Sequence, residues 1–369
     1  MKELKTIIEE YNKIDFSKNK AALATVVRVE GSSYRRTGAR MLVMESGEWI
    51  GGISGGCLEG DALKKARLTM SQNKPTLITY DTSDDDPYQI GVGLGCNGII
   101  DVLITPLNPE NPNNAILQVK DLIGKRTPNA VVTILGMKNP IEGIQMGDVF
   151  RYDSDEKFAE VFPVNEIKNQ LTEDLNHSLK SGRSIPKNYT LADGNEIKIF
   201  LEILMPDIHL VVYGTNYDIY PMVRIAKELG WKVSVICNPQ KVHASLFQIA
   251  DEVLPKDTNP VIDSYTAVVL MSHDYENDYA NLLKLLKTEV SYIGMLGPAK
   301  RNKKMYDRMH EEGISISETD LKRIHNPIGL DIGATTPEEI AVSIAAEIRS
   351  HFAGREGTSL KYRGKPIHE

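Results

Sequence analysis

The sequence predicts an α/β protein of two domains, a small N-terminal α/β domain over residues 1–206 and a parallel-sheet domain over residues 207–369. A chain of 369 residues is longer than one ordinary core requires, so two domains are expected. In the second half, short apolar strands alternate with helices of roughly ten residues, which is typical of a parallel sheet covered on both faces. The first half carries strand-like segments, and the last of these stops at Pro206.

The elements of the first domain follow from local periodicity. Residues 1–14 predict an amphipathic helix that lacks the apolar stretch and cleavage site of a signal peptide. The remaining expected elements are strands at 21–31, on either side of Ser46–Gly47, and at 76–80, 98–107, 130–135 and 197–204, with a helix at 61–70. Residues 108–118 indicate a surface connection, whereas residues 147–195 show no clear pattern.

The second domain has the more regular pattern. The expected strands are 209–214, 232–237, 266–272 and 292–297, and the expected helices include 220–229 and one through 281–287. The last helix has the strongest signal, because Thr336 can cap it, Pro337 suits its first turn and Glu339 completes a capping box. Gly354 marks its end.

Composition excludes several classes of protein. The formal net charge of −7 argues against nucleic-acid binding, which needs a basic face. Three cysteines cannot form a disulfide framework, and no apolar run is long enough to span a bilayer. We therefore expect a cytoplasmic protein without nucleic-acid or membrane partners.

Two segments of the first domain have the composition of anion sites. Residues 31–42 concentrate Arg35, Arg36 and Arg40, whose guanidinium groups suit phosphate or carboxylate, although a solvated basic loop is an equal alternative. In residues 51–61, five glycines including Gly55 and Gly56 bracket Ser54 and Cys57 ahead of a helix. Backbone N–H groups there attract anions and favour a reactive thiolate, and the alternative is an inert buried cysteine.

A second glycine–cysteine loop follows at residues 91–98 and contains Gly95 and Cys96. The two loops could face one another across one site, or their cysteines could form a redox pair. The spacing does not fit a zinc site, since it offers no C-x-x-C and no four convergent ligands.

In the second domain, Gly214 follows a strand as the first glycine of a Rossmann phosphate turn does. The other glycines of that motif are missing, and Asn238 stands where an NAD site usually has an acid, so NAD binding is weakened. His273 and Asp274 follow another strand, at the edge where open α/β sheets bind ligands. The alternative for His273 is an ordinary loop or capping role.

Together, these segments resemble the XdhC/CoxI family of xanthine dehydrogenase accessory factors. The similarity lies in GSSYRRTGARMLV, GGISGGCLEG, GLGCNG, FLEILMP, YIGMLG and HNPIGLDIGATTPEEIAVSIAAEI, which occur in the family's order in both halves of the chain. The resemblance implies a Rossmann-like second domain and a homodimer. It also implies a cofactor chaperone, rather than a turnover enzyme, that binds molybdenum cofactor and assists its sulfuration and insertion into a molybdenum hydroxylase apoenzyme.

The resemblance also extends to single residues. Cys57 and Cys96 match the family's cysteines and would be soft contacts to molybdenum or its sulfur. The cofactor-binding candidates are Arg35, Arg40, Ser54, Gly55, Gly56, Cys57, Glu59, Gly95, Cys96, Gly214, His273 and Asp274. A cysteine desulfurase is left open as a second partner, and the mono- or dinucleotide form of the cofactor is also open. The alternative functions are an NAD- or flavin-dependent oxidoreductase with a divergent Rossmann site, and a sulfur-transfer enzyme that uses both cysteines.

Overall fold

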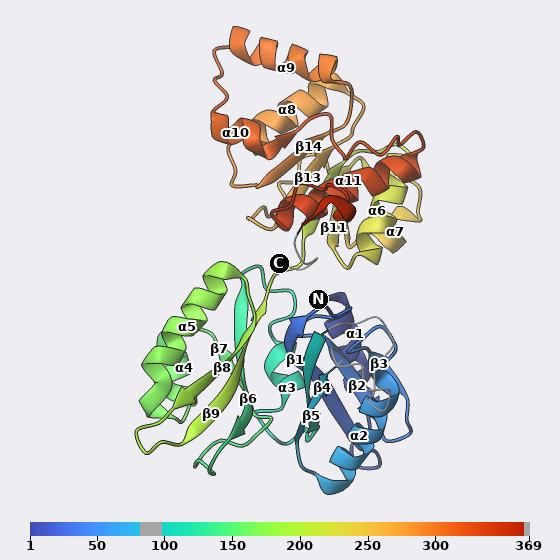
Figure 1. The fold of residues 1–369 in the computed structure, drawn as a ribbon. Helices are drawn as coiled ribbons and strands as arrows, with labels where there is room; N and C mark the ends of the chain where they lie inside the picture. The colour runs from blue at the N-terminus through green and yellow to red at the C-terminus, as the bar shows by residue number, and fades with distance from the viewer. Residues whose placement is uncertain (82–97, 365–369) are drawn as a thin grey trace. The chain divides into compact units, whose positions relative to one another are not determined.

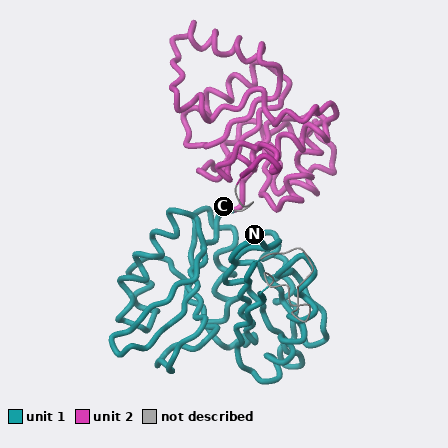
Figure 2. Tube along the Cα trace, in the orientation of Figure 1, with its two compact units in different colours: residues 1–206, 368–369 teal, residues 207–367 magenta. Residues whose placement is uncertain are grey.

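The structure is a computed structural model that describes residues 1–81 and 98–364 (Figure 1). The chain divides into two compact units, unit 1 over Met1–Pro206 and unit 2 over Asp207–Ile367 (Figure 2). The predicted α/β class is confirmed, because antiparallel sheets and helices make up unit 1 while unit 2 has one parallel sheet. In the part of the chain described, no helix is long and apolar enough to cross a membrane.

Unit 1 contains two antiparallel sheets. The five-stranded sheet has the order β3-β2-β1-β5-β4, and the four-stranded sheet has the order β7-β6-β9-β8. The strands are β1 (Ala21–Gly31), β2 (Arg40–Met44), β3 (Trp49–Gly51), β4 (Thr76–Asp81), β5 (Gly98–Pro106), β6 (Asn129–Met137), β7 (Val149–Tyr152), β8 (Ile185–Thr190) and β9 (Glu196–Leu204). The helices are α1 (Lys2–Tyr11), α2 (Glu59–Gln72), α3 (Ala115–Lys120), α4 (Asp155–Val161) and α5 (Lys168–Ser181).

The two sheets of unit 1 pack on each other through their inner faces. Val27 and Leu103 of the first sheet share one buried cluster with Leu135 and Phe200 of the second. The outer face of the five-stranded sheet is covered by α2, and the outer face of the four-stranded sheet by α4 and α5 (Figure 1). Alternate residues of a strand face opposite sides of a sheet, so both sheets are apolar on two faces.

Unit 2 is a doubly wound parallel sheet of six strands. Its elements are β10 (His209–Tyr213), α6 (Ile219–Glu228), β11 (Lys232–Cys237), α7 (Leu246–Ile249), β12 (Glu252–Pro255), β13 (Thr266–Leu270), α8 (Tyr275–Leu285), β14 (Tyr292–Met295), α9 (Ala299–Glu311), α10 (Glu318–Arg323), β15 (Ile324–His325) and α11 (Pro337–Phe352). The strand order β12-β11-β10-β13-β14-β15 corresponds to 3-2-1-4-5-6, the dinucleotide-fold order. Leu210 and Val212 pack toward α6 and α11, whereas Val211 and Tyr213 pack toward α8 and α9.

Local signals predicted most of these elements. The capping box of α11 is confirmed, since the Thr336 hydroxyl accepts from the Glu339 amide and the Glu339 carboxylate accepts from the Thr336 amide. The surface connection expected at 108–118 instead leads into α3, which Asn114 caps. The segment without a clear pattern, 147–195, forms β7, α4, α5 and β8, and the short strands β12 and β15 were not expected.

Candidate functional site

The glycine loop ahead of α2 is held in shape by Glu59. Its Oε1 accepts hydrogen bonds from the amides of Ile53 (3.1 Å) and Ser54 (2.8 Å), and its Oε2 accepts one from the Ser54 hydroxyl. Ser54 Oγ in turn accepts from the amides of Gly56 and Leu58, at 3.2 and 3.1 Å. Burial by itself raises the pKa of Glu59, but the hydrogen bonds from Ser54 and Ile53 outweigh it and keep the pKa below its usual value.

This arrangement leaves the tip of the loop at the surface. Gly55 and Gly56 are exposed, and a Cβ added at Gly56 would meet nothing within 4 Å. Cys57 is a free cysteine whose side chain is partly exposed and packs partly against the α2 core. Gly95 and Cys96 lie outside the described residues. Among the residues that are described, no group of three or more His, Cys, Asp or Glu side chains is arranged to hold a metal ion.

The arginines of residues 31–42 have internal partners. Arg40 is 5% exposed, and its two terminal nitrogens donate to the two carboxylate oxygens of Glu202, at 2.8 and 2.5 Å. Arg35 pairs with Glu3 at 2.5 Å on a partly exposed surface. The expected basic anion pocket is therefore replaced at these two positions by ion pairs within unit 1.

In unit 2, the predicted residues gather at the carboxyl edge of the sheet. After β10, the next two strands are added on one side of it, and the chain then crosses to the other side to form β13. The strand order therefore reverses between β10 and β13, and open α/β sheets bind ligands at such a point. A pocket of about 360 Å³ lies there. Gly214 and Asp274 line it, together with Asn238 after β11 and Lys256 after β12. A Cβ at Gly214 would lie 2.9 Å from the Met271 carbonyl oxygen, so only glycine fits this turn without displacement.

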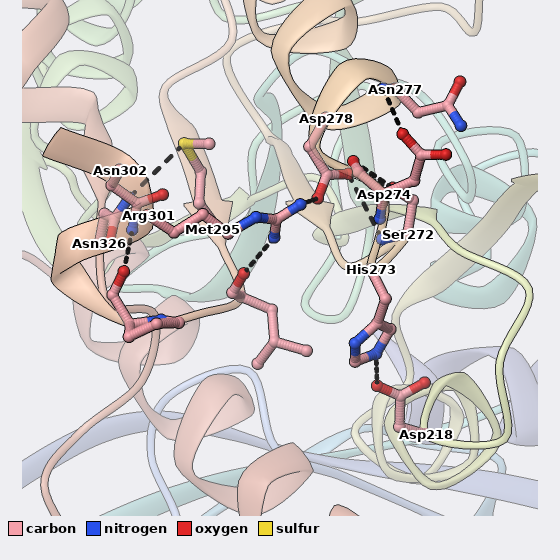
Figure 3. A network of polar contacts seen from close by, with 12 residues as sticks. Asp218, Ser272, His273, Asp274, Asn277, Asp278, Met295, Arg301, Asn302 and Asn326 are labelled. Atoms are coloured by element: carbon pink, nitrogen blue, oxygen red, sulfur yellow. Dashed lines mark hydrogen bonds and ion pairs between the residues drawn. The ribbon is translucent and has the colours of Figure 1, made fainter. Parts of the chain in front are cut away.

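His273 lies beside this pocket and lines a second one of about 290 Å³. Its Nε2 hydrogen-bonds to Asp218 Oδ2 at 2.6 Å (Figure 3). His273 has φ +57°, a left-handed conformation that is uncommon for a residue with a side chain. Its neighbour Asp274 caps α8 by accepting from the Asn277 amide at 3.0 Å, and this bond lowers the pKa of Asp274. The positions of His273 and Asp274 are therefore fixed by the end of β13, by the left-handed turn at His273 and by the cap of α8.

A partly buried ion pair, Arg301 with Asp278, holds the loops that follow β13 and β14. Arg301 donates to Asp278 Oδ2 at 2.9 Å and to the Leu296 carbonyl oxygen at 3.1 Å (Figure 3). Asp278, which is 1% exposed, also accepts from the Ser272 hydroxyl at 2.6 Å. Ser272 precedes His273 and lines the pocket of about 360 Å³, so this network positions the backbone at the edge of the site.

The structure brings Gly214 and Asp274 into one pocket and places His273 in the wall of the second pocket. Among the lining residues that the sequence analysis did not select are three lysines, Lys241, Lys256 and Lys284. Lys241 and Lys256 follow strands β11 and β12, so the strand-end rule could have found them. Lys284 lies near the end of α8, and only the packing of that helix shows which side faces the pocket.

Comparison with known proteins gives consistent matches in both units. The profile of the XdhC Rossmann domain matches residues 210–348, and that of the XdhC and CoxI family matches residues 17–81. A probable subunit of xanthine dehydrogenase from Bacillus subtilis (strain 168) is 29% identical over 336 residues, which cover 89% of this chain and 92% of that protein. The molybdenum cofactor insertion chaperone PaoD of Escherichia coli (strain K12) is 23% identical over 330 residues, covering 89% and 83%.

A solved structure matches this chain along its full length. The crystal structure of a xanthine dehydrogenase from Bacillus halodurans is 26% identical, with a TM-score of 0.70 over 100% of this chain and 99% of that one. The profile matches lie in order along the chain, one in each unit, and the structural match covers both. The chain belongs to the XdhC/CoxI family.

Proposed function

We propose that this chain is an accessory protein that binds molybdenum cofactor as cargo and assists its sulfuration and insertion into a xanthine dehydrogenase-type molybdenum hydroxylase. Two relatives support the proposal by name, one as part of a xanthine dehydrogenase and the other as a molybdenum cofactor insertion chaperone. In this proposal the protein is a cytoplasmic homodimer. It docks on the hydroxylase apoenzyme, receives sulfur through a cysteine desulfurase, and needs no turnover of its own.

The observation that carries the proposal is the construction of the loop 54–59. Glu59 and Ser54 consume the inward-facing backbone amides, so the loop keeps its shape without a ligand. What remains outward is Gly55, which lies against the ring of Tyr34, then Gly56, with no atom of another described residue near its Cβ position, and the partly exposed Cys57. Backbone can approach a planar ligand closely where side chains are absent, and a thiolate suits a soft centre such as molybdenum or its sulfur.

The charges of unit 1 set a limit on this binding mode. Arg40 is buried in its pair with Glu202 and cannot reach the cargo's phosphate, and the partly exposed Arg35 already carries the Glu3 carboxylate. In this proposal Cys57 and the glycine backbone hold the molybdenum end of the cargo, and a phosphate needs cations from elsewhere in the chain.

Anaerobic titration of the purified full chain with molybdenum cofactor tests the proposal. We expect saturable binding that Cys57→Ser weakens about tenfold, as for the loss of one strong contact. Cys237→Ala is the matched control, because Cys237 is buried in β11 and should not affect binding. Transfer to the apoenzyme, measured as recovered hydroxylase activity, should fall in parallel with binding.

Two results would count against the proposal at different levels. If Cys57→Ser and wild type bind equally, the loop is not the site. If natively folded protein shows no saturable binding at all, the chain does not carry this cargo.

A further inference from the structure

The pocket at the carboxyl edge of unit 2 has a size and shape suited to one small ligand. Its volume of about 360 Å³ lies at the lower end of the range for ligand pockets, roughly 300–1,000 Å³. Residues that follow four neighbouring strands contribute to its wall, among them Gly214, Asn238, Lys256 and Ser272. In the dinucleotide-fold order, this position above the first three strands is where the nucleoside half of a nucleotide lies.

The charge of the pocket is unusual for an acidic chain. Lys241, Lys256 and Lys284 line it, and among the described residues none of the three forms a salt bridge. Of its described lining residues, only Asp274 is acidic. Three positive groups therefore face one negative group, in a chain whose formal net charge is −7. An anion entering this pocket would meet three lysines that form no salt bridge with any described residue.

The opposite edge of the same strands provides a contrast. Lys227 pairs with Asp251 at 2.7 Å, and Lys232 pairs with Glu252 at 2.9 Å. At that edge, both lysines are accompanied by carboxylates. The three pocket lysines lie instead at the edge where open α/β sheets bind ligands.

Amide side chains complete the wall. Asn277, Asn281 and Lys284 are spaced by four and three residues on α8, so they share one face of the helix, and all three line the pocket. Asn238 accepts from the Gln240 amide at 3.0 Å, which fixes its side chain at the end of β11. Amides both donate and accept hydrogen bonds, as recognition of a nucleobase or a ribose hydroxyl requires. An acid at position 238 would repel a phosphate, and the asparagine does not.

A dinucleotide could not take the usual path from this pocket. In dinucleotide sites the pyrophosphate lies at the N-terminus of the first helix. Here the residue at that cap is Asp218, whose carboxylate pairs with His273 Nε2. A negative side chain at the start of the helix occupies the positive end of the helix dipole, where a phosphate would otherwise bind. Beyond this pair lies the second pocket, which is lined mainly by apolar residues such as Met222 and Leu296.

We infer that the pocket formed by Gly214, Asn238, Lys241, Lys256, Asn281 and Lys284 is a binding site for one phosphorylated nucleoside. The lysines hold the phosphate, the amides contact the base or sugar, and the Asp218–His273 pair prevents a dinucleotide from extending past the Gly214 turn. The ligand is either a free mononucleotide or the nucleotide end of a larger molecule such as the proposed cargo. The site itself does not depend on the proposed cofactor function, because a free mononucleotide is sufficient to occupy it.

Isothermal titration of the full chain with AMP, CMP and GMP tests this inference. We expect saturable 1:1 binding of at least one of them, and weaker or no binding of the matching nucleoside and of inorganic phosphate. Lys241→Gln and Lys256→Gln should each weaken binding about tenfold, the usual effect of losing one charge-assisted bond. Lys227→Gln is the control for charge, because Lys227 is paired at the opposite edge and should leave the affinity unchanged.

Three results would overturn the inference. Equal binding of inorganic phosphate and nucleotide would reduce the site to an adventitious ion only. Equal weakening by Lys227→Gln would mean that the total charge, and not this pocket, attracts the ligand. Tighter binding of NAD than of any mononucleotide would remove the restriction to one nucleotide and reopen the oxidoreductase alternative.

Competition distinguishes the two ligand sources. If the nucleotide form of molybdenum cofactor displaces the bound mononucleotide and the form without a nucleotide does not, the site recognises the end of a larger molecule. If neither displaces it, the site serves a free nucleotide, and the cargo titration on Cys57 is unaffected.

Discussion

Replacing Arg40 by alanine is expected to lower the free energy of unfolding of unit 1 by about 3–5 kcal/mol, because it leaves the buried Glu202 carboxylate without its partner. Both side chains are almost fully buried, at 6% and 3% exposure, so water cannot replace the lost bonds. The pair joins β2 of one sheet to β9 of the other. A loss of this size is a large fraction of the stability of an ordinary domain, about 5–15 kcal/mol.

Urea unfolding measures this effect, and two further variants make it specific. Arg35→Ala removes a partly exposed pair with Glu3 and should cost at most about 1 kcal/mol. The double variant Arg40→Met with Glu202→Leu should recover most of the loss, because it removes both buried charges. Peptides from β10 should keep their hydrogen-exchange protection, since unit 2 has its own core. A cost for Arg40→Ala no larger than that of Arg35→Ala would contradict the argument.

This expectation also affects the choice of test for cofactor binding. Arg40 lies in a motif shared with the family, and its substitution would reduce binding simply by unfolding unit 1. Cys57→Ser is the cleaner variant, because the Cys57 side chain is partly exposed and forms no ion pair with a described residue.

The second large effect is expected at Asp101, a buried carboxylate of β5. It accepts hydrogen bonds from Arg28 (2.9 Å), Thr79 (2.7 Å) and Lys198 (3.1 Å), which come from β1, β4 and β9. Asp101→Asn should lower the free energy of unfolding by about 2–3 kcal/mol. We expect less than for Arg40→Ala because Arg28 and Lys198 are 29% and 32% exposed and can turn toward water.

The direction of the pKa shift of Asp101 predicts how stability should change with pH. Burial raises the pKa of Asp101, but the hydrogen bonds from Thr79, Arg28 and Lys198 outweigh burial and keep the pKa below its ordinary value. The stabilisation is therefore complete above the unfolded pKa of about 3.9, and it is lost as pH falls through the lower folded pKa. Wild-type stability should decline below about pH 4, and Asp101→Asn should show a shallower decline. If the stability of both proteins declines equally as the pH falls below about 4, Asp101 does not have this role.

Local sequence determined much of the fold. Runs of β-branched and apolar residues gave β1 its full length, Ala21–Gly31, because such side chains fit a strand that is buried along most of its length. The start of α11 was also predictable, since Thr336, Pro337 and Glu339 act on backbone groups within one turn of the helix. The alternation of strands and helices in unit 2 predicted a parallel sheet, because parallel neighbours need a helical crossover.

Other features depend on residues that are distant in the sequence. Arg40 and Arg35 have the composition of an anion loop, and only folding shows that Glu202 and Glu3 neutralise them. A strand as short as β15, with two residues, has no periodicity and exists only because β14 pairs with it. The lysines of the nucleotide pocket are ordinary surface residues in the sequence, and the strand order of the sheet brings them together. Tertiary structure alone decides which charges are paired, because pairing depends on distances in space that the sequence does not contain.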